Sequence, residues 1–158
     1  MKRILLSLTV LFSSATFASA ANLDSTHGNW NVYSNGKDAC YIASVPVDED
    51  GNFKKRGQPY VLINSKKKTD EVNISSGYTY KSAVDVEISV DNKKFKLFTK
   101  DENAWAKDAT ADKAIVTAMK SGAKLIVKGI SSKNSYSTDT YSLKGAGAAY
   151  KRMKQLCK

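Results

Sequence analysis

Histidine, cysteine and long apolar runs are scarce in this chain of 158 residues, and each scarcity excludes a class of function. With one histidine, His27, and two cysteines, Cys40 and Cys157, a typical zinc site would lack its three or four ligands once the cysteines were paired. The nucleophile elbows, phosphate loops and dinucleotide-binding fingerprints that mark many enzymes are also missing from strand-to-helix contexts. We therefore expect no catalytic residues, no cofactor and no bound metal.

One class of enzyme stays possible, because a glycoside hydrolase needs only two acidic side chains that converge in space. The candidates are six scattered acidic residues: Asp85, Glu87, Asp101, Asp108, Asp112 and Asp139. Such scatter is expected by chance in a charged chain, so a small carbohydrate-active enzyme is the third hypothesis.

The acidic stretch 48–52 fails the register of a calcium loop, since Gly51 at the sixth position would make Pro46 the first ligand. We expect an acidic hairpin turn there.

The amino terminus carries the three parts of a cleavable export signal. Lys2 and Arg3 precede a short apolar stretch at 4–12, and Ala-Ser-Ala at 18–20 forms a cleavage site. A membrane-spanning helix needs about 20 apolar residues, and this run ends too early. We therefore expect residues 1–20 to be removed as a signal peptide. Residues 21–158 should form a single domain, periplasmic or secreted, with no transmembrane segment.

Positive charge dominates the composition. The formal net charge is +10, or +8 without the two charges of Lys2 and Arg3, which should attract anionic polysaccharide, lipopolysaccharide or membrane headgroups. Nucleic acid is not expected as a partner, because only Arg56 and Arg152 then remain for bidentate phosphate and base contacts. The lysines form short clusters beside expected turns, which favours solvated loop charge over a dedicated anion site.

Alternation of apolar and polar side chains predicts a mainly β domain. The clearest case is 84–90, where valine and isoleucine alternate with Asp, Glu and Ser, followed by a turn at Asp91-Asn92 and renewed alternation through Phe95 and Leu97. This pattern predicts a β-hairpin. Further strands are expected at 30–34, 39–45, 59–64, 71–75, 123–130 and 135–143. Short strands at this spacing are typical of an antiparallel sandwich or barrel.

Two segments have a helical period instead. From Thr110, one apolar face is formed by Ala111, Ala114, Ile115, Ala118 and Met119. Asp108 or Thr110 is expected to cap this helix, and Gly122 to end it in the left-handed conformation. The second helix covers about 146–157, and its inward stripe consists of Ala146, Ala149, Tyr150, Met153 and Cys157.

The two cysteines are expected to form one intramolecular disulfide. Export favours oxidation, a pair of cysteines allows a single pairing, and His27 offers no evident partner for a catalytic thiol. For so long a loop, the chain-entropy model gives a stabilisation of about 4 to 5 kcal/mol at most. Because Cys157 lies on the inward stripe, the bond should fasten the last helix to the sheet that contains Cys40.

An ordered series of motifs resembles the invasion-associated locus B family over almost the whole mature chain. The motifs are Arg56-Gly57 to Val61, Glu71-Val72 to Gly77-Tyr78, Phe95-Lys96-Leu97-Phe98, Ala104-Trp105-Ala106, 118–122, 127–129, Thr138-Asp139-Thr140-Tyr141-Ser142-Leu143-Lys144-Gly145, 148–150 and Cys157. The resemblance implies export by a Gram-negative bacterium and an immunoglobulin-like antiparallel β-sandwich with one or two added α-helices. It also implies a link, in pathogenic members, to host-cell invasion. It supplies no catalytic residues to carry over.

The candidate binding surface follows from where the chain departs from that family. Relatives commonly have an Arg-Gly-Thr-containing turn at 131–135, and here this turn holds Lys133 and Asn134. In the next strand, alternation places Asp139 and Tyr141 on one face and Thr138 and Thr140 on the other. If one of these faces is exposed to solvent, it is the first candidate for a binding surface.

Large rings can fill a core or form an exposed platform for sugar or peptide. Core packing is the expectation for Trp30 and Trp105. The leading functional hypothesis is then a non-catalytic envelope or secreted module that binds an unknown macromolecular partner of the envelope or host surface. An anion-binding envelope protein is the second hypothesis, and a contiguous lysine patch would distinguish it.

Overall fold

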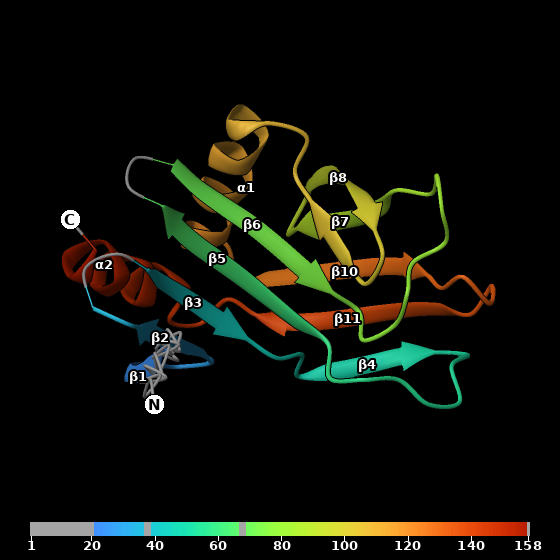
Figure 1. Ribbon diagram of the computed structural model, residues 1–158, viewed down its shortest axis with the longest axis horizontal. Coiled ribbons are helices and arrows are strands. Elements are labelled where there is room, and N and C mark those ends of the chain that lie inside the picture. Colours follow the sequence, from blue (N-terminus) through green and yellow to red (C-terminus); the bar gives the residue numbers. More distant parts are fainter. Residues whose placement is uncertain (1–20, 37–38, 67–68, 158) are drawn as a thin grey trace, which may run out of the picture.

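The computed structural model describes residues 21–36, 39–66 and 69–157, which form a mainly β domain with two helices (Figure 1). The expected signal peptide at 1–20 lies outside the described residues. Within the described residues, eleven strands make one continuous antiparallel sheet in the order β1-β2-β3-β5-β6-β9-β8-β7-β10-β11-β4. The expected mainly β architecture with added helices is confirmed.

The elements follow the predicted strands and helices closely, with three additions. Their bounds are β1 (Asn22–His27), β2 (Trp30–Ser34), β3 (Cys40–Ser44), β4 (Asp48–Gly51), β5 (Tyr60–Lys66), β6 (Thr69–Ser75), β7 (Val86–Val90), β8 (Lys93–Lys100), β9 (Asn103–Trp105), α1 (Ala109–Ser121), β10 (Lys124–Ile130), β11 (Tyr136–Ser142) and α2 (Ala146–Leu156). The sequence patterns missed β1, β4 and β9. The acidic stretch expected to be a hairpin turn is the edge strand β4, paired with β11.

The sheet folds back on itself at β8. The first half of this strand pairs with β7 through Val86↔Leu97, whereas its last residues pair with β9 through Phe98↔Trp105. The two halves of the sheet therefore face each other as the layers of a sandwich, and a single hydrophobic core lies between them. Trp30 is completely buried in this core, as expected.

Both helices pack on the inner face, where α1 contacts β6 and α2 contacts β2 and β3. Asp108 caps α1 as predicted, accepting a hydrogen bond of 2.8 Å from the Ala111 N–H. The expected left-handed conformation at Gly122 is wrong, because its backbone is extended (φ −79°, ψ 168°) and leads directly into β10. Glycine suits this position because a Cβ there would collide with Val90 and Leu143.

Asp112 shows how α1 is attached to the sheet. Instead of pointing to solvent, it is buried and accepts a hydrogen bond of 2.8 Å from the Val72 N–H of β6. This N–H lies beyond the end of β9, which pairs with β6 at Asn73 and Ile74. Burial raises the pKa of the Asp112 carboxyl, and the hydrogen bond from Val72 opposes the rise. The buried stripe of the helix is therefore rotated, and Ala114 is exposed.

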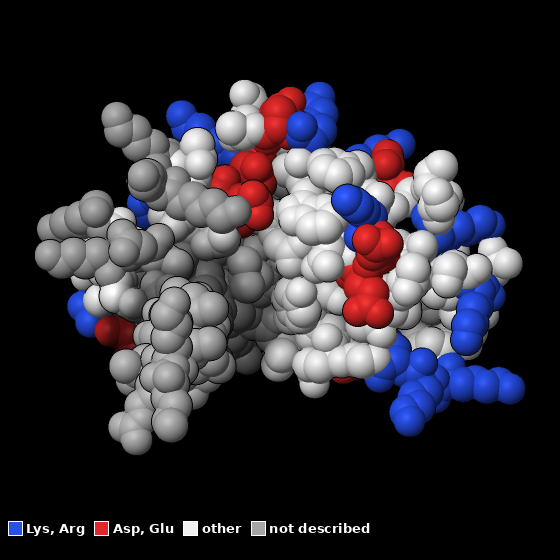
Figure 2. Space-filling view, in the orientation of Figure 1, with Lys and Arg blue, Asp and Glu red and all other residues white. Residues whose placement is uncertain are grey.

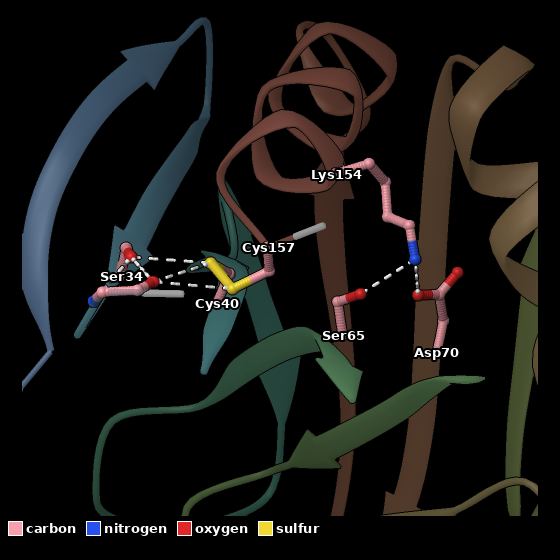
Figure 3. The surroundings of a disulfide bond; sticks show 7 residues. Ser34, Cys40, Ser65, Asp70, Lys154 and Cys157 are labelled. Carbon is pink, nitrogen blue, oxygen red and sulfur yellow. Dashed lines mark hydrogen bonds and ion pairs between the residues drawn. A yellow bond between two sulfur atoms is a disulfide. The ribbon is translucent and has the colours of Figure 1, made fainter. Parts of the chain in front are cut away.

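The expected disulfide joins Cys40 of β3 to Cys157 at the end of α2, with a Cα–Cα distance of 6.0 Å (Figure 3). Both residues are buried. Lys154 of the same helix reaches Ser65 at 2.9 Å and Asp70 at 3.0 Å, and Tyr150 donates to Asp70 at 2.6 Å. The disulfide and these polar contacts, together with the pair of Arg152 and Asp24 of β1, hold α2 against the sheet.

A buried ion pair occupies the other end of the sandwich. The two terminal nitrogens of Arg56 donate to the two carboxylate oxygens of Asp139 at 2.9 and 2.6 Å. Asp139 is fully buried and the Arg56 side chain is only 3% exposed. Arg56 also contacts Glu49 of β4 at 2.6 Å and the Ser76 carbonyl at 3.1 Å. One side chain therefore connects β4, β11 and the end of β6.

The pKa values of this pair reflect burial and mutual attraction. Burial raises the pKa of the Asp139 carboxyl, and the Arg56 guanidinium offsets part of the rise. Burial opposes the charge of Arg56, but Asp139 and Glu49 outweigh it and raise the pKa of the guanidinium. Within the described residues, Arg56 Nε and the Tyr141 hydroxyl are buried without a hydrogen-bond partner.

We predict that the double substitution C40A/C157A lowers the free energy of unfolding by about 2 to 5 kcal/mol, because the unfolded chain loses its constraint. Urea denaturation followed by circular dichroism measures the loss against the parent protein. As a control, protein recovered from an oxidising compartment should show no alkylated cysteine by mass spectrometry unless it is first reduced. Two alkylated cysteines without reduction would contradict the disulfide.

We also predict that Asp139→Asn lowers the free energy of unfolding by about 3 to 5 kcal/mol, because it leaves a buried guanidinium without its counter-ion. The matched control is Asp24→Asn, which breaks a second bidentate pair, to the partly exposed Arg152. Solvent screens that pair, so stability should change little. Equal losses in the two variants, measured by urea denaturation, would show that burial does not set the cost.

Candidate functional site

A groove of about 500 Å³ lies at the end of the sandwich where the loop after β4 meets the turn between β10 and β11. We call it the end groove. Its lining combines three kinds of side chain, which are the lysines Lys54, Lys55 and Lys133, the rings of Phe53 and Tyr78, and the hydroxyls of Thr79, Ser131, Ser132 and Ser135, together with Asn52. Its volume is in the range of sites that hold small molecules or single units of a polymer.

The end groove is strongly basic. Lys54, Lys55 and Lys133 are exposed, and within the described residues none of them forms an ion pair. No acidic residue is among those that line it. The nearby carboxylates of Glu49 and Asp139 are paired with Arg56. Figure 2 shows the same asymmetry, with blue side chains gathered at the right-hand end of the molecule, where these two loops lie in Figure 1.

The turn at 131–135 is held by its own hydrogen bonds. The Ser131 N–H donates to the Ser135 carbonyl at 2.7 Å, and the Ser135 N–H donates to the Ser131 hydroxyl at 3.0 Å. Asn134 takes the left-handed conformation (φ 62°), which asparagine adopts more readily than most residues. The Ser132 N–H donates to the Thr79 carbonyl at 2.8 Å, which anchors the turn to the neighbouring loop. The turn expected at 131–135 is confirmed.

The wall of the end groove across from this turn is the loop after β4, and it depends on the buried pair of Arg56 and Asp139. The Arg56 guanidinium lies 4.0 Å from the centre of the Phe53 ring, so the same side chain that pairs with Asp139 also supports this ring. Asn52 fixes the start of the loop, because its side-chain oxygen accepts from the Tyr136 N–H at 2.7 Å. The loop therefore presents Phe53, Lys54 and Lys55 from a fixed frame.

Tyr78 connects the floor of the end groove to the core. Its hydroxyl lies 2.8 Å from that of Ser137, and its ring meets Tyr80 edge-on with 5.4 Å between the centres. Burial raises the pKa of the Tyr78 hydroxyl. Gly129 allows this packing, because a Cβ there would lie 2.7 Å from the Tyr78 hydroxyl. The ring is therefore held in place from behind.

The residues proposed from sequence divide into two groups. Lys133 lines the end groove and Asn134 lies next to it in the same turn; both are exposed, and Lys81 donates to Asn134 Oδ1 at 2.7 Å. Asp139 and Tyr141 are fully buried, so their face is not available to a partner. The alternation was correct, but it could not show that Arg56 would neutralise Asp139 inside the core.

Thr138 and Thr140 occupy the other face of β11 and are half-buried. They lie opposite Asp50 and Asp48 of β4, which covers the edge of β11. This pair of threonines stays a predicted contact surface. The sequence carries one signal for the rest of the end groove, which is Phe53 next to Lys54 and Lys55. These lysines were interpreted as solvated loop charge.

Trp105 differs from its expected core position. It is only partly buried, and its ring stacks on the exposed ring of Phe98 with 5.8 Å between the centres. Alternation in this segment turns Ala104 and Ala106 inward instead. The pair lines a shallower pocket with charges of both signs, including Lys100. It forms an exposed aromatic surface separate from the end groove.

The six scattered carboxylates do not converge on one site. Asp108 caps α1, Asp112 binds the Val72 N–H, and Asp139 pairs with Arg56. Asp85 and Glu87 line a shallow pocket together with a lysine. Across 21–36, 39–66 and 69–157, no group of three or more His, Cys, Asp or Glu side chains could hold a metal ion.

Among the helices of the described residues, none is both long and apolar enough to cross a membrane.

Both the sequence and the fold are similar to those of known proteins. Residues 31–154 match the model of a family described as Invasion associated locus B (IalB) protein. The crystal structure of invasion associated protein B from Bartonella henselae is similar, with a TM-score of 0.61 and 16% sequence identity over 85% of this chain and 98% of that chain. No curated protein sequence matches significantly. The match to the family covers β3 to β11, the end groove and most of α2, and the chain therefore belongs to the invasion associated locus B family.

Proposed function

We propose that this protein is an exported, non-catalytic binding module that contacts a macromolecular partner of the bacterial envelope or host-cell surface through the end groove. One observation carries the proposal: the groove holds three lysines that form no ion pair with any described residue, beside two rings and several hydroxyls, on a frame fixed by Arg56 and Asp139. Exposed polar and aromatic groups on a rigid support are typical of recognition sites.

Family membership supports the compartment. The Bartonella henselae protein is called invasion associated, and a similar role for this chain belongs to our proposal. The buried disulfide supports export, because such bonds persist in oxidising compartments. The acids that hold structural positions support a binding role over hydrolysis, since Asp108, Asp112 and Asp139 are engaged in caps or pairs.

A second candidate is binding to any anionic surface through net charge. The formal charge of +10 favours it, and so does the convergence of Lys54, Lys55 and Lys133 on one groove. The two candidates differ in what a change of charge should do. A recognition site loses binding when its own lysines change, whereas attraction by net charge falls equally when any three exposed lysines change.

We predict that the triple substitution K54E/K55E/K133E lowers binding to envelope vesicles or host cells at least tenfold, because it reverses the charge of the end groove. The experiment expresses the whole chain in a Gram-negative host, labels the recovered protein and measures binding by flow cytometry. The matched control is K93E/K96E/K124E, which makes the same charge change on β8 and at the start of β10. These lysines are exposed and none of them lines the groove, and Lys93 and Lys124 lie at the far end of β10 from it.

The control variant should keep most of the binding. Circular dichroism should show that both variants fold. An equal loss in both variants would favour attraction by net charge, and no loss in either would remove the end groove from the proposed function.

A further inference from the structure

We propose that the ligand class of the end groove is an anionic saccharide, in which a sugar ring packs against Phe53 and Tyr78 while its phosphate, sulfate or carboxylate group meets the lysines. This inference rests on the proposed function, because it names the chemistry of the partner at the same groove. The shared chemistry could come from a lipopolysaccharide core or from a host glycosaminoglycan.

The unused polar groups of the groove carry the first step. Of its hydroxyls, those of Thr79, Ser132 and Ser135 make no hydrogen bond within the described part of the chain. Each hydroxyl can both donate and accept, which matches the hydroxyls of a sugar. Within the described residues the three lysines of the lining make no ion pair either, whereas Lys154 and Lys81, which do not line the groove, donate to Asp70 and Asn134. The groove therefore holds neutral hydrogen-bonding groups as well as cations.

The rings carry the second step. Phe53 and Tyr78 both line the groove and are partly exposed, although each has enough apolar surface to be buried in a core. Arg56 holds Phe53 from one side, and Ser137 and Tyr80 hold Tyr78. Rings fixed in this way can pack against the C–H face of a sugar without losing side-chain freedom on binding.

Other anionic polymers fit the groove less well. A peptide that added a strand here would have to pair with the edge strand β4, whose exposed acidic residues Asp48 and Asp50 would repel an anionic peptide. Nucleic acid would favour arginine for bidentate phosphate contacts, whereas the exposed cations here are lysines and the nearby Arg56 is buried against Asp139. The mixture of hydroxyls, rings and lysines favours a charged sugar.

The test measures binding of four probes by fluorescence anisotropy as a function of salt. The probes are a heparin-derived oligosaccharide, a phosphorylated lipopolysaccharide core oligosaccharide, neutral dextran and single-stranded DNA of matched charge. We expect at least one of the two anionic saccharides to bind at least tenfold more tightly than DNA, and dextran to bind weakly. Which of the two binds better identifies the bacterial or the host source.

Two variants separate the roles of charge and ring. K54A/K55A/K133A should weaken saccharide binding more than tenfold and flatten its dependence on salt, because fewer ions are displaced. Phe53→Leu keeps apolar volume beside Arg56 but removes the ring, so it should weaken binding about fivefold to tenfold and leave the salt dependence unchanged. Phe98→Leu, which alters an exposed ring outside the groove, is its control and should bind as the parent does. The melting temperature of each variant checks that it folds.

Two results would overturn the inference. DNA that binds as tightly as both saccharides, with no effect of Phe53→Leu, would show a site for polyanions in general. If neither saccharide binds while envelope or host-cell binding still depends on Lys54, Lys55 and Lys133, the proposed function stands and the saccharide is excluded. If surface binding also fails to depend on these lysines, both proposals fall.

Discussion

The buried pair of Arg56 and Asp139 is the interaction on which the rest of this structure depends. Its guanidinium contacts β4, β11, the end of β6 and the Phe53 ring, so three parts of the chain that are distant in sequence, at 49–56, 76 and 139, share one set of contacts. A buried ion pair does not by itself make a protein more stable than an apolar core would. Its effect here is on position. The contacts of Arg56 with Glu49 and Asp139 fix the loop after β4, and this loop forms one wall of the end groove.

The two ends of the sandwich are built for different purposes. At one end, the disulfide between Cys40 and Cys157 and the contacts of Lys154 close the core beneath α2. At the other end, no helix covers the meeting point of the described loops, and polar groups remain directed to the surface. The core is covered at the end beneath α2, and the loops are held in place at the other end. A ligand could therefore bind in the end groove with little rearrangement of the protein.

Membership in the invasion associated locus B family and the chemistry of the end groove address different questions. The family indicates where such a protein acts, and the similar Bartonella henselae structure shows the fold. Neither identifies a ligand. The lysines, rings and hydroxyls that line the end groove supply that inference.

Most of the fold could be predicted from the sequence, because local periodicity reports which side of an element is buried. Alternation located β7 and β8, the helical period located α1 and α2, and the pair of cysteines located the disulfide. The strands β1, β4 and β9 were missed because β1 and β4 are largely exposed and β9 has only three residues, so none of them shows a clear alternation. Only the tertiary structure decided that Asp112 and Asp139 are buried and that Phe53, Tyr78 and Lys133 meet in one groove. Burial of a charge and convergence of loops depend on partners far away in the chain, and local sequence carries no record of those distances.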